Sequence, residues 1–328
     1  MDSPYAAGTG MNSMRIRLVA LTIALPLLAA CGSAAGATSQ ATPTSAPTPS
    51  ASASAAPGSV QRGVVYCTNA GVALTMDIYR PSQVGEAPTP AVLYVHGGGW
   101  EHGSSTLGGI NASISQMLTQ RGILVAAVNY RLAPEYLWPA QIDDVKCAVR
   151  YLRANAQQYG IDPAKIGAWG GSAGGHLVSM LGTAGPGAGF DTGQYLQQSS
   201  SVQAVVDMFG PADLTAGGWG PGATSVVQQV FGVAPGQDSS ALAHASPVTY
   251  IQPNDPPFLI FQGTRDAVVP PSQSQELASR LQAAGVSATL IMVQNGGHGF
   301  APTGGAISPT LQEITQTTVD FLSQHLQR

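Results

Sequence analysis

Short apolar runs alternate with longer amphipathic segments along this chain from about residue 60 onward. The apolar runs carry almost no charges, which is typical of strands buried on both faces of a sheet. Such strands are expected at residues 91–95, 123–129, 165–169, 202–209, 258–262 and 288–293. Helical spacing of apolar residues predicts helices at 110–121, 141–159, 272–284 and 311–326. The alternation predicts an α/β domain in which a mostly parallel sheet carries helices on both faces.

Several segments depart from this alternation. Residues 63–66 and 73–79 are predicted to form a hairpin, because the turn signal Asn69-Ala70-Gly71 lies between them. Residues 161–163 are expected to turn the chain into the strand at 165–169. Residues 182–201 are rich in Gly and Gln and predict a surface loop. Residues 214–251 contain short helix-like pieces that could cover a functional site.

A different pattern occupies the N-terminal segment. Arg15 and Arg17 precede an apolar run at residues 18–28, which is too short to span a bilayer comfortably and is interrupted by Pro26. The run ends at Cys31 in the sequence Leu-Ala-Ala-Cys-Gly, which resembles a bacterial lipoprotein box. In such a box the cysteine becomes the lipidated first residue of the mature chain. An ordinary cleaved signal with an incidental cysteine is the alternative.

The next residues, 32–59, consist almost wholly of Ala, Ser, Thr, Pro and Gly. Such a segment cannot bury a core, so it predicts a disordered tether. We therefore expect a signal sequence at 1–31, a tether at 32–59 and a folded domain at 60–328. The expected location is the outer face of a bacterial membrane, with membrane contact only through the lipid anchor, or otherwise secretion.

Composition narrows the classes of partner. The chain has 13 Lys and Arg against 17 Asp and Glu. Because it has no excess of basic residues, nucleic acid is not expected as a binding partner. Three cysteines occur, and Cys31 is assigned to the anchor. An even pair then remains in an exported protein, so Cys67 and Cys147 form a candidate disulfide, with two buried free thiols as the alternative. No cysteine or histidine spacing resembles a metal site.

The sequence Gly170-Gly171-Ser172-Ala173-Gly174 stands between the strand at 165–169 and an apolar segment that predicts a helix. This Gly-x-Ser-x-Gly pattern is typical of a sharp strand–turn–helix, in which residues two before and two after the serine must lack bulk. The turn lifts the Ser172 hydroxyl clear of the sheet. It also places the first amides of the helix where an anion is favoured. Ser172 is therefore a candidate nucleophile.

A second glycine-rich turn, His96-Gly97-Gly98-Gly99-Trp100, follows the strand at 91–95. Three glycines after a buried strand allow backbone N–H groups to point into an opening, which suits a developing oxyanion. A flexible turn without chemistry is the alternative. A phosphate cradle is disfavoured, because no Gly-Lys-Ser/Thr follows and no dinucleotide pattern is present.

Two titratable residues follow later strands. Asp266 comes after the strand at 258–262, and His298, with glycines on both sides, comes after the strand at 288–293. Loops beyond the carboxyl ends of parallel strands form the sites of α/β proteins. A turn-forming aspartate and a solvated histidine are the alternatives. Less favoured candidates, which lack a suitable strand end or begin a helix or turn, are His96, His102, His176, His244, His325, Asp162, Asp207 and Asp255.

The chain order Ser172, Asp266, His298 is that of the α/β-hydrolases. Residues 63–326 resemble an esterase or lipase of this superfamily. The turn at 96–100 and Tyr-Arg-Leu-Ala-Pro-Glu at 130–135 resemble the hormone-sensitive-lipase-like group. Gly-Gly-Ser-Ala-Gly-Gly-His-Leu at 170–177 and Gly-His-Gly-Phe at 297–300 more closely resemble feruloyl-esterase-like and kynurenine-formamidase-like branches. The chain departs from the lipase group at Gly171, usually Asp there, and at His176, often Asn.

The resemblance implies a catalytic domain at 60–328 with Ser172 as nucleophile, His298 as base and Asp266 as the group that orients the base. It places the oxyanion donors at the amides of Gly98, Gly99 and Ala173. This chemistry needs no cofactor and no metal.

The expected function is a serine carboxylesterase that hydrolyses small-molecule esters through an acyl-enzyme, with small acyl, feruloyl or acetyl esters as candidate substrates. An amidase or arylformamidase is the nearest alternative, and a non-catalytic binding domain tethered to the envelope is a remote one. Trp100, Trp138, Trp219 and Tyr136 either line an aromatic pocket or belong to the core. A lipase for long chains is disfavoured, because no long apolar cap is evident.

Overall fold

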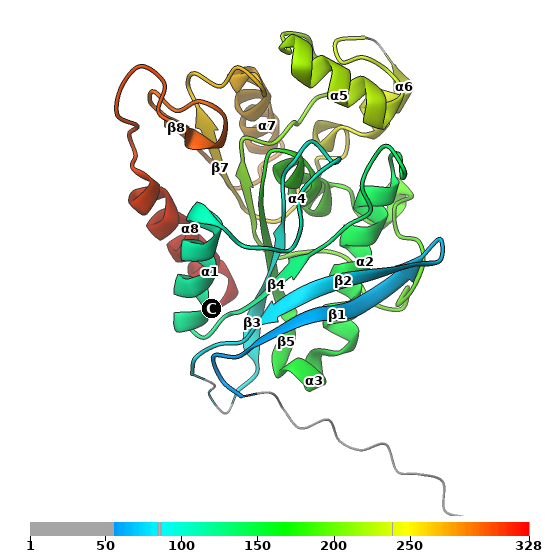
Figure 1. The fold of residues 1–328 in the computed structure, drawn as a ribbon, viewed down its shortest axis with the longest axis vertical. Coiled ribbons are helices and arrows are strands. Elements are labelled where there is room, and N and C mark those ends of the chain that lie inside the picture. Colours follow the sequence, from blue (N-terminus) through cyan, green and yellow to red (C-terminus); the bar gives the residue numbers. More distant parts are fainter. Residues whose placement is uncertain (1–55, 84, 86, 238, 328) are drawn as a thin grey trace, which may run out of the picture. The chain divides into compact units, whose positions relative to one another are not determined.

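A computed structural model describes residues 56–327 apart from residues 84, 86 and 238 (Figure 1). The expected signal sequence, its Cys31 and the tether up to residue 55 lie outside the described residues. Among the helices that are described, none combines the length and the apolar character of a transmembrane span.

The described residues form one sheet of eight strands in the order β1-β2-β4-β3-β5-β6-β7-β8. The strands are β1 (Val60–Asn69), β2 (Val72–Tyr79), β3 (Thr89–Val95), β4 (Leu124–Val128), β5 (Ile161–Gly171), β6 (Val205–Met208), β7 (Phe258–Gly263) and β8 (Ala288–Val293). Strand β2 pairs antiparallel with β1 and β4, and the other pairs are parallel. The mostly parallel sheet expected from the sequence is confirmed.

Helices cover both faces of this sheet (Figure 1). They are α1 (Gly109–Gln120), α2 (Ala140–Ala154), α3 (Ala156–Tyr159), α4 (Ala173–Thr183), α5 (Pro221–Phe231), α6 (Ser240–His244), α7 (Pro271–Ala283) and α8 (Leu311–Leu326). Alternate residues of β3 show the two layers. Val92 and Tyr94 pack in the cluster that contains α1 and α8 side chains, whereas Leu93 and Val95 pack with α2, α4 and α7. The period of two along each strand thus divides the core into two layers.

Three expected elements differ from the structure. The helix expected at 141–159 is divided into α2 and α3 at Asn155, whose side chain donates to the carbonyl of Tyr151 at 2.8 Å. The turn expected at 161–163 lies inside β5, where the pairing shifts between Ile161 and Ile166 and takes up the extra residues. Strand β6 is also shorter than the expected 202–209. The hairpin at β1 and β2 is confirmed.

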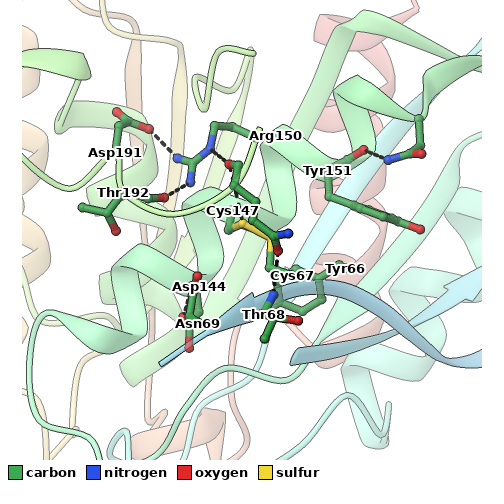
Figure 2. Close-up of a disulfide and its surroundings, with 12 residues drawn as sticks. Tyr66, Cys67, Thr68, Asn69, Asp144, Cys147, Arg150, Tyr151, Asp191 and Thr192 are labelled. Atoms are coloured by element: carbon green, nitrogen blue, oxygen red, sulfur yellow. Dashed lines mark hydrogen bonds and ion pairs between the residues drawn. A yellow bond between two sulfur atoms is a disulfide. The ribbon is translucent and has the colours of Figure 1, made fainter. Parts of the chain in front are cut away.

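The segment between α4 and β6 is a loop with one short 3-10 helix, η1 (Pro186–Ala188). Side chains of α2 hold this loop (Figure 2). The Arg150 guanidinium, which is 1% exposed, pairs with Asp191 at 2.7 Å and donates to the carbonyl of Gln194 at 3.0 Å. Lys146 pairs with the other Asp191 oxygen at 3.1 Å. Cys147, between these two cations on α2, is joined to Cys67 of β1 by a disulfide.

Candidate active site

Ser172 occupies the sharp turn between β5 and α4. Its backbone lies in a strained region, with φ 56° and ψ −123°, and its amide donates to the carbonyl of Met208 at 2.9 Å. The flanking glycines make the turn possible. A Cβ at Gly174 would lie 2.1 Å from the carbonyl oxygen of Val95, and one at Gly170 would lie 2.5 Å from that of Gly174. The strand end and the helix start therefore touch, as the Gly-x-Ser-x-Gly pattern predicts.

The structure brings the hydroxyl of Ser172 to the imidazole of His298 and this ring to the carboxylate of Asp266. Ser172 Oγ lies 2.9 Å from His298 Nε2, and His298 Nδ1 lies 2.8 Å from Asp266 Oδ2. A carboxylate only accepts, so Nδ1 carries the proton and Nε2 accepts from the serine. The three residues follow β5, β7 and β8, and Ser172 and His298 are 126 residues apart in the chain.

The loop after β7 holds the Asp266 carboxylate in place. Its Oδ1 accepts from the amides of Val268 at 2.8 Å and Val269 at 3.0 Å. Its Oδ2 faces His298 and the side-chain amide of Gln262, at 3.3 Å. The Asp266 side chain is fully buried, whereas that of His298 is 26% exposed. The carboxylate is thus fixed from behind, and the histidine opens toward the cavity.

The glycine turn packs directly on the Ser172 elbow. A Cβ at Gly97 would lie 2.7 Å from the carbonyl oxygen of Gly171. Gly98 and Gly99 both have positive φ, and a Cβ at Gly98 would lie 2.2 Å from the carbonyl oxygen of His102. The strand end before the turn is tied down, because Tyr130 donates to the carbonyl of His96 at 3.0 Å. The His96 ring stacks on Tyr130, and burial lowers its pKa, which favours a structural role.

A cavity of about 420 Å³ opens at Ser172. Glycines and apolar side chains form most of its wall: Gly98, Gly99, Trp100, Pro211, Trp219, Gly222, Ala223, Val226, Val227, Val268 and Val269. His298 is the one titratable side chain among the described residues that line it. Helix α5 supplies one side, so part of the segment 214–251 does cover this end of the sheet. The arrangement can hold an uncharged molecule against a hydroxyl and an imidazole.

Two of the four aromatic residues considered from the sequence line this cavity, namely Trp100 and Trp219. Trp138 instead packs beside Phe231 and Phe190. Tyr136 lies under the Arg131 guanidinium, 5.3 Å from its ring centroid, on the wall of a different hollow. The small residues of α5 that shape the cavity were not predicted, although a Pro-Gly-Ala start at 221–223 was a visible signal of a helix with little bulk in its first turn.

The other acidic residues near this end of the sheet have partners of their own. Asp207 on β6 is buried, accepts from Ser179 Oγ at 3.0 Å and from the Gly210 amide at 2.9 Å, and burial raises its pKa to about 7. Asp213 accepts from the amide and hydroxyl of Thr215. Within the described part of the chain, no three His, Cys, Asp or Glu side chains gather as a metal site.

Comparison with known proteins finds relatives that are named esterases. The BD-FAE family model matches residues 76–281. Esterase LipC of Mycobacterium tuberculosis is 30% identical over 77% of this chain and 65% of its own length. The probable carboxylic ester hydrolase LipM of the same organism is 32% identical over 65% of this chain and 49% of its own length. The chain thus spans from about half to just under two thirds of these relatives.

Solved structures agree with this fold. A truncated form of a carbohydrate esterase from gut microbiota matches with a TM-score of 0.71 and 31% identity, over 82% of this chain and 97% of that one. Esterase 2 of Thermogutta terrifontis with bound propionate matches with a TM-score of 0.66 and 27% identity, over 82% of this chain and 94% of that one. With its eight-stranded sheet and flanking helices, the chain has the α/β-hydrolase fold and belongs to the BD-FAE family.

Proposed function

We propose that this chain is a serine carboxylesterase that works through an acyl-enzyme. One observation carries the proposal: a continuous hydrogen-bond chain runs from Ser172 through His298 to buried Asp266 and opens into the apolar cavity. The names of the relatives and of the similar structures, which are esterases, support it.

The chemistry follows from the positions of the atoms. Ser172 Oγ attacks the ester carbonyl while His298 Nε2 takes its proton. Asp266 keeps the proton on Nδ1 and stabilises the imidazolium that forms. The protonated His298 then gives its proton to the departing alcohol, and the same ring later activates a water that releases the acid.

The negative charge of the tetrahedral intermediate needs donors on the side away from His298. We assign this role to the amides of Gly98, Gly99 and Ala173. Gly98 and Gly99 line the cavity beside Ser172. Ala173 is the first residue of α4, and amides in a first helical turn have no partner within the helix. Three backbone donors without side chains in the way suit an oxyanion.

The cavity indicates the substrate class. Its wall offers no fixed charge for an anionic substrate, so an uncharged ester with a small or medium acyl or alkyl group is the best match. Acetyl and feruloyl esters of carbohydrates fit this description, and a similar structure is titled a carbohydrate esterase. An amide substrate is a second candidate, because rabbit arylacetamide deacetylase is 38% identical over 32% of this chain.

Two measurements test this function. A fluorophosphonate should label Ser172 in the parent and leave Ser172→Ala unlabelled. Rates on p-nitrophenyl acyl esters, methyl ferulate, acetyl-xylan, N-formylkynurenine and an aryl acetamide should then be highest for esters. A parent chain that is folded, unlabelled and inert on the whole panel would make this a binding domain. Amide rates above all ester rates would make it an amidase.

Helix α5 offers a test of the cavity as the substrate site. Ala223 lines the cavity, whereas Ser225 lies exposed on the same helix. We expect Ala223→Phe to reduce kcat/KM for a bulky ester such as methyl ferulate far more than for an acetyl ester. Ser225→Phe is the matched control and should leave both unchanged. Equal losses on both esters in Ala223→Phe would contradict this assignment.

We also propose that Cys31 anchors the protein by lipid to the outer face of a bacterial membrane. The apolar run that ends at this cysteine supports the proposal. Cys31→Ser should move the protein from the membrane fraction to the soluble fraction, since lipoprotein anchoring depends on acyl chains. A variant that fractionates like the parent would contradict the anchor.

A further inference from the structure

A second histidine lies beneath the Ser172 elbow, outside the proposed proton-transfer chain. His176 is fully buried on α4, and its backbone amide donates to the carbonyl of Ser172 at 3.0 Å, one helical turn away. Its ring makes two hydrogen bonds to other parts of the chain. Nδ1 accepts from Trp100 Nε1 at 3.2 Å, and Nε2 donates to the carbonyl of Ala245 at 2.7 Å.

These partners belong to different segments of the chain, and Trp100 is the one of the two that lines the cavity. Trp100 directly follows Gly98 and Gly99, lines the cavity, and has a strained positive φ of 59°. Ala245 follows α6 in the segment that covers this end of the sheet. The His176 imidazole therefore connects three parts of the chain: helix α4, which begins directly after Ser172, the glycine turn at 96–100, and the segment 214–251.

The ring suits this position because a neutral imidazole presents an acceptor on one nitrogen and a donor on the other. Burial lowers the pKa of His176 to about 4, so the ring is neutral at neutral pH. Three aromatic rings enclose it, those of Trp100, Trp138 and Phe231, with centroids 5.3 to 5.9 Å away. The Trp100 indole contacts Phe231 edge-on, with ring centroids 5.0 Å apart. Because Phe231 is the last residue of α5, this helix also contacts the glycine turn at 96–100.

We propose that His176 is a positioning residue that holds the glycine turn in place against the Ser172 elbow through Trp100. Close backbone contacts fix Gly97 and Gly98 within the turn, and the bond from Trp100 adds a side-chain hold at the end of the turn. Tyr130 ties the entrance of the turn at His96, and His176 ties its exit at Trp100. Small displacements of oxyanion donors reduce the rate of the chemical step rather than substrate binding. The inference rests on the proposed esterase function.

Two substitutions of the ring separate its two hydrogen bonds. His176→Asn can place an oxygen near the Nδ1 position and keep the bond from Trp100. His176→Gln can place an amide nitrogen near the Nε2 position and keep the bond to Ala245, but it loses the acceptor for Trp100. We expect His176→Gln to lower kcat about tenfold with KM little changed, and His176→Asn to retain most of kcat. His244→Gln is the matched control, because this exposed neighbour of Ala245 contacts Phe190 and Tyr250 and should leave kcat unchanged.

Trp100→Phe tests the same bond from its other end and remains informative if a His176 variant does not fold. It keeps an aromatic ring but removes the N–H, so kcat should again fall about tenfold. The double variant Trp100→Phe/His176→Gln should be little slower than either single one, because both remove one interaction. Concentrations of active enzyme are titrated with a fluorophosphonate, so that unfolded protein does not count as lost kcat.

Independent, additive losses in the double variant, or equal losses in His176→Asn and His176→Gln, would overturn the positioning role. Parental kcat in a folded His176→Gln variant would do the same. In each of these outcomes the parent still hydrolyses ester and labels at Ser172, so the proposed function stands. A parent that neither labels nor hydrolyses ester would instead overturn the function itself.

Discussion

Two regions of this molecule are held in place by different means. At the carboxyl ends of β3 and β5, backbone conformation does most of the positioning. Gly98 and Ser172 have positive φ, and a Cβ at Gly174 would lie 2.1 Å from a neighbouring carbonyl oxygen. Such close approach leaves the nucleophile little freedom to move relative to the turn beside it.

At the corner where the β1–β2 hairpin meets α2, side chains do the holding instead (Figure 2). The Cys67–Cys147 disulfide links strand to helix, and Asp191 of the irregular loop lies between two buried cations of α2. This loop contains one short 3-10 helix between α4 and β6, so few backbone hydrogen bonds are available to fix it. We therefore expect changes at the site to reduce activity and changes at this corner to reduce stability.

The largest effect that would test this division concerns the site. Ser172→Ala and His298→Ala should each reduce kcat/KM on an activated ester by about 10⁴-fold or more, because the groups act as one unit. The double variant should be little worse than either single one. Asp266→Asn should retain more activity, since His298 remains in a poorer tautomer.

Circular dichroism serves as the folding control for these variants, and the free energy of unfolding should change little in each. Parental activity in a folded Ser172→Ala chain would overturn the proposed function. Parental activity in a folded Asp266→Asn chain would show that another group orients His298.

The corner should show the converse behaviour. Replacing Cys67 and Cys147 by alanine should lower the free energy of unfolding by about 4 kcal/mol, because the disulfide closes a loop that greatly restricts the unfolded chain. The sequence separation of the two cysteines is 80 residues. At a temperature where the variant is folded, kcat/KM should equal that of the parent. Urea denaturation and ester hydrolysis measure the two quantities, and a large fall in kcat/KM would show that the two regions are coupled.

A smaller, pH-dependent effect concerns the buried carboxyl of Asp207 behind the elbow. Its pKa is raised to about 7 from 3.8, so the folded state binds more protons than the unfolded state between these values. Folding stability from this group therefore falls as pH rises through that window. Asp207→Asn removes the titration, so the variant should gain stability relative to the parent by at most about 1.4 kcal/mol per pH unit. The gain should level off above pH 7.

The contribution of His176 to stability changes with pH in the opposite direction to that of Asp207. Its pKa is lowered from 6.5 to about 4, so its contribution to stability is present above 6.5 and is lost as pH falls toward 4. In Asp207→Asn this loss is no longer offset by Asp207, and acidification should destabilise the variant more than the parent. Urea denaturation from pH 4.5 to 8 measures both curves. Parallel curves would show that Asp207 does not titrate in this range.

The smallest effect concerns an ion pair outside both regions. Arg280 and Glu276 pair at 2.6 Å on α7, with 52% and 30% of their side chains exposed. Glu276→Ala, which leaves the longer 3.9 Å contact of Arg280 with Asp213 in place, should change the free energy of unfolding by no more than about 0.5 kcal/mol, and salt should reduce that difference. A decrease in the free energy of unfolding as large as that expected for the disulfide would contradict the expectation that exposure weakens this ion pair relative to the buried pairs at Asp191.

Much of the fold could be predicted from the sequence, because strand and helix periods are local properties. The apolar run at 91–95 lies within β3, and the Gly-x-Ser-x-Gly pattern is a strand, turn and helix. The candidate residues Asp266 and His298 follow β7 and β8, since parallel strands bring their carboxyl ends to one edge of the sheet. Their catalytic roles, and those of Gly98, Gly99 and Ala173, stay predictions.

Tertiary structure decided what local patterns do not encode. The cavity wall on α5 depends on which turn of that helix faces Ser172. The bond from Trp100 to His176 joins residues 76 positions apart, and Trp138 was excluded from the cavity only by its packing against Phe231. Periodicity reports which face of an element is buried, but not which distant segment covers it. Thus the sequence by itself determined the sheet, the elbow and the order of the candidate residues. Side-chain packing between distant segments determined the cavity and the support of the glycine turn.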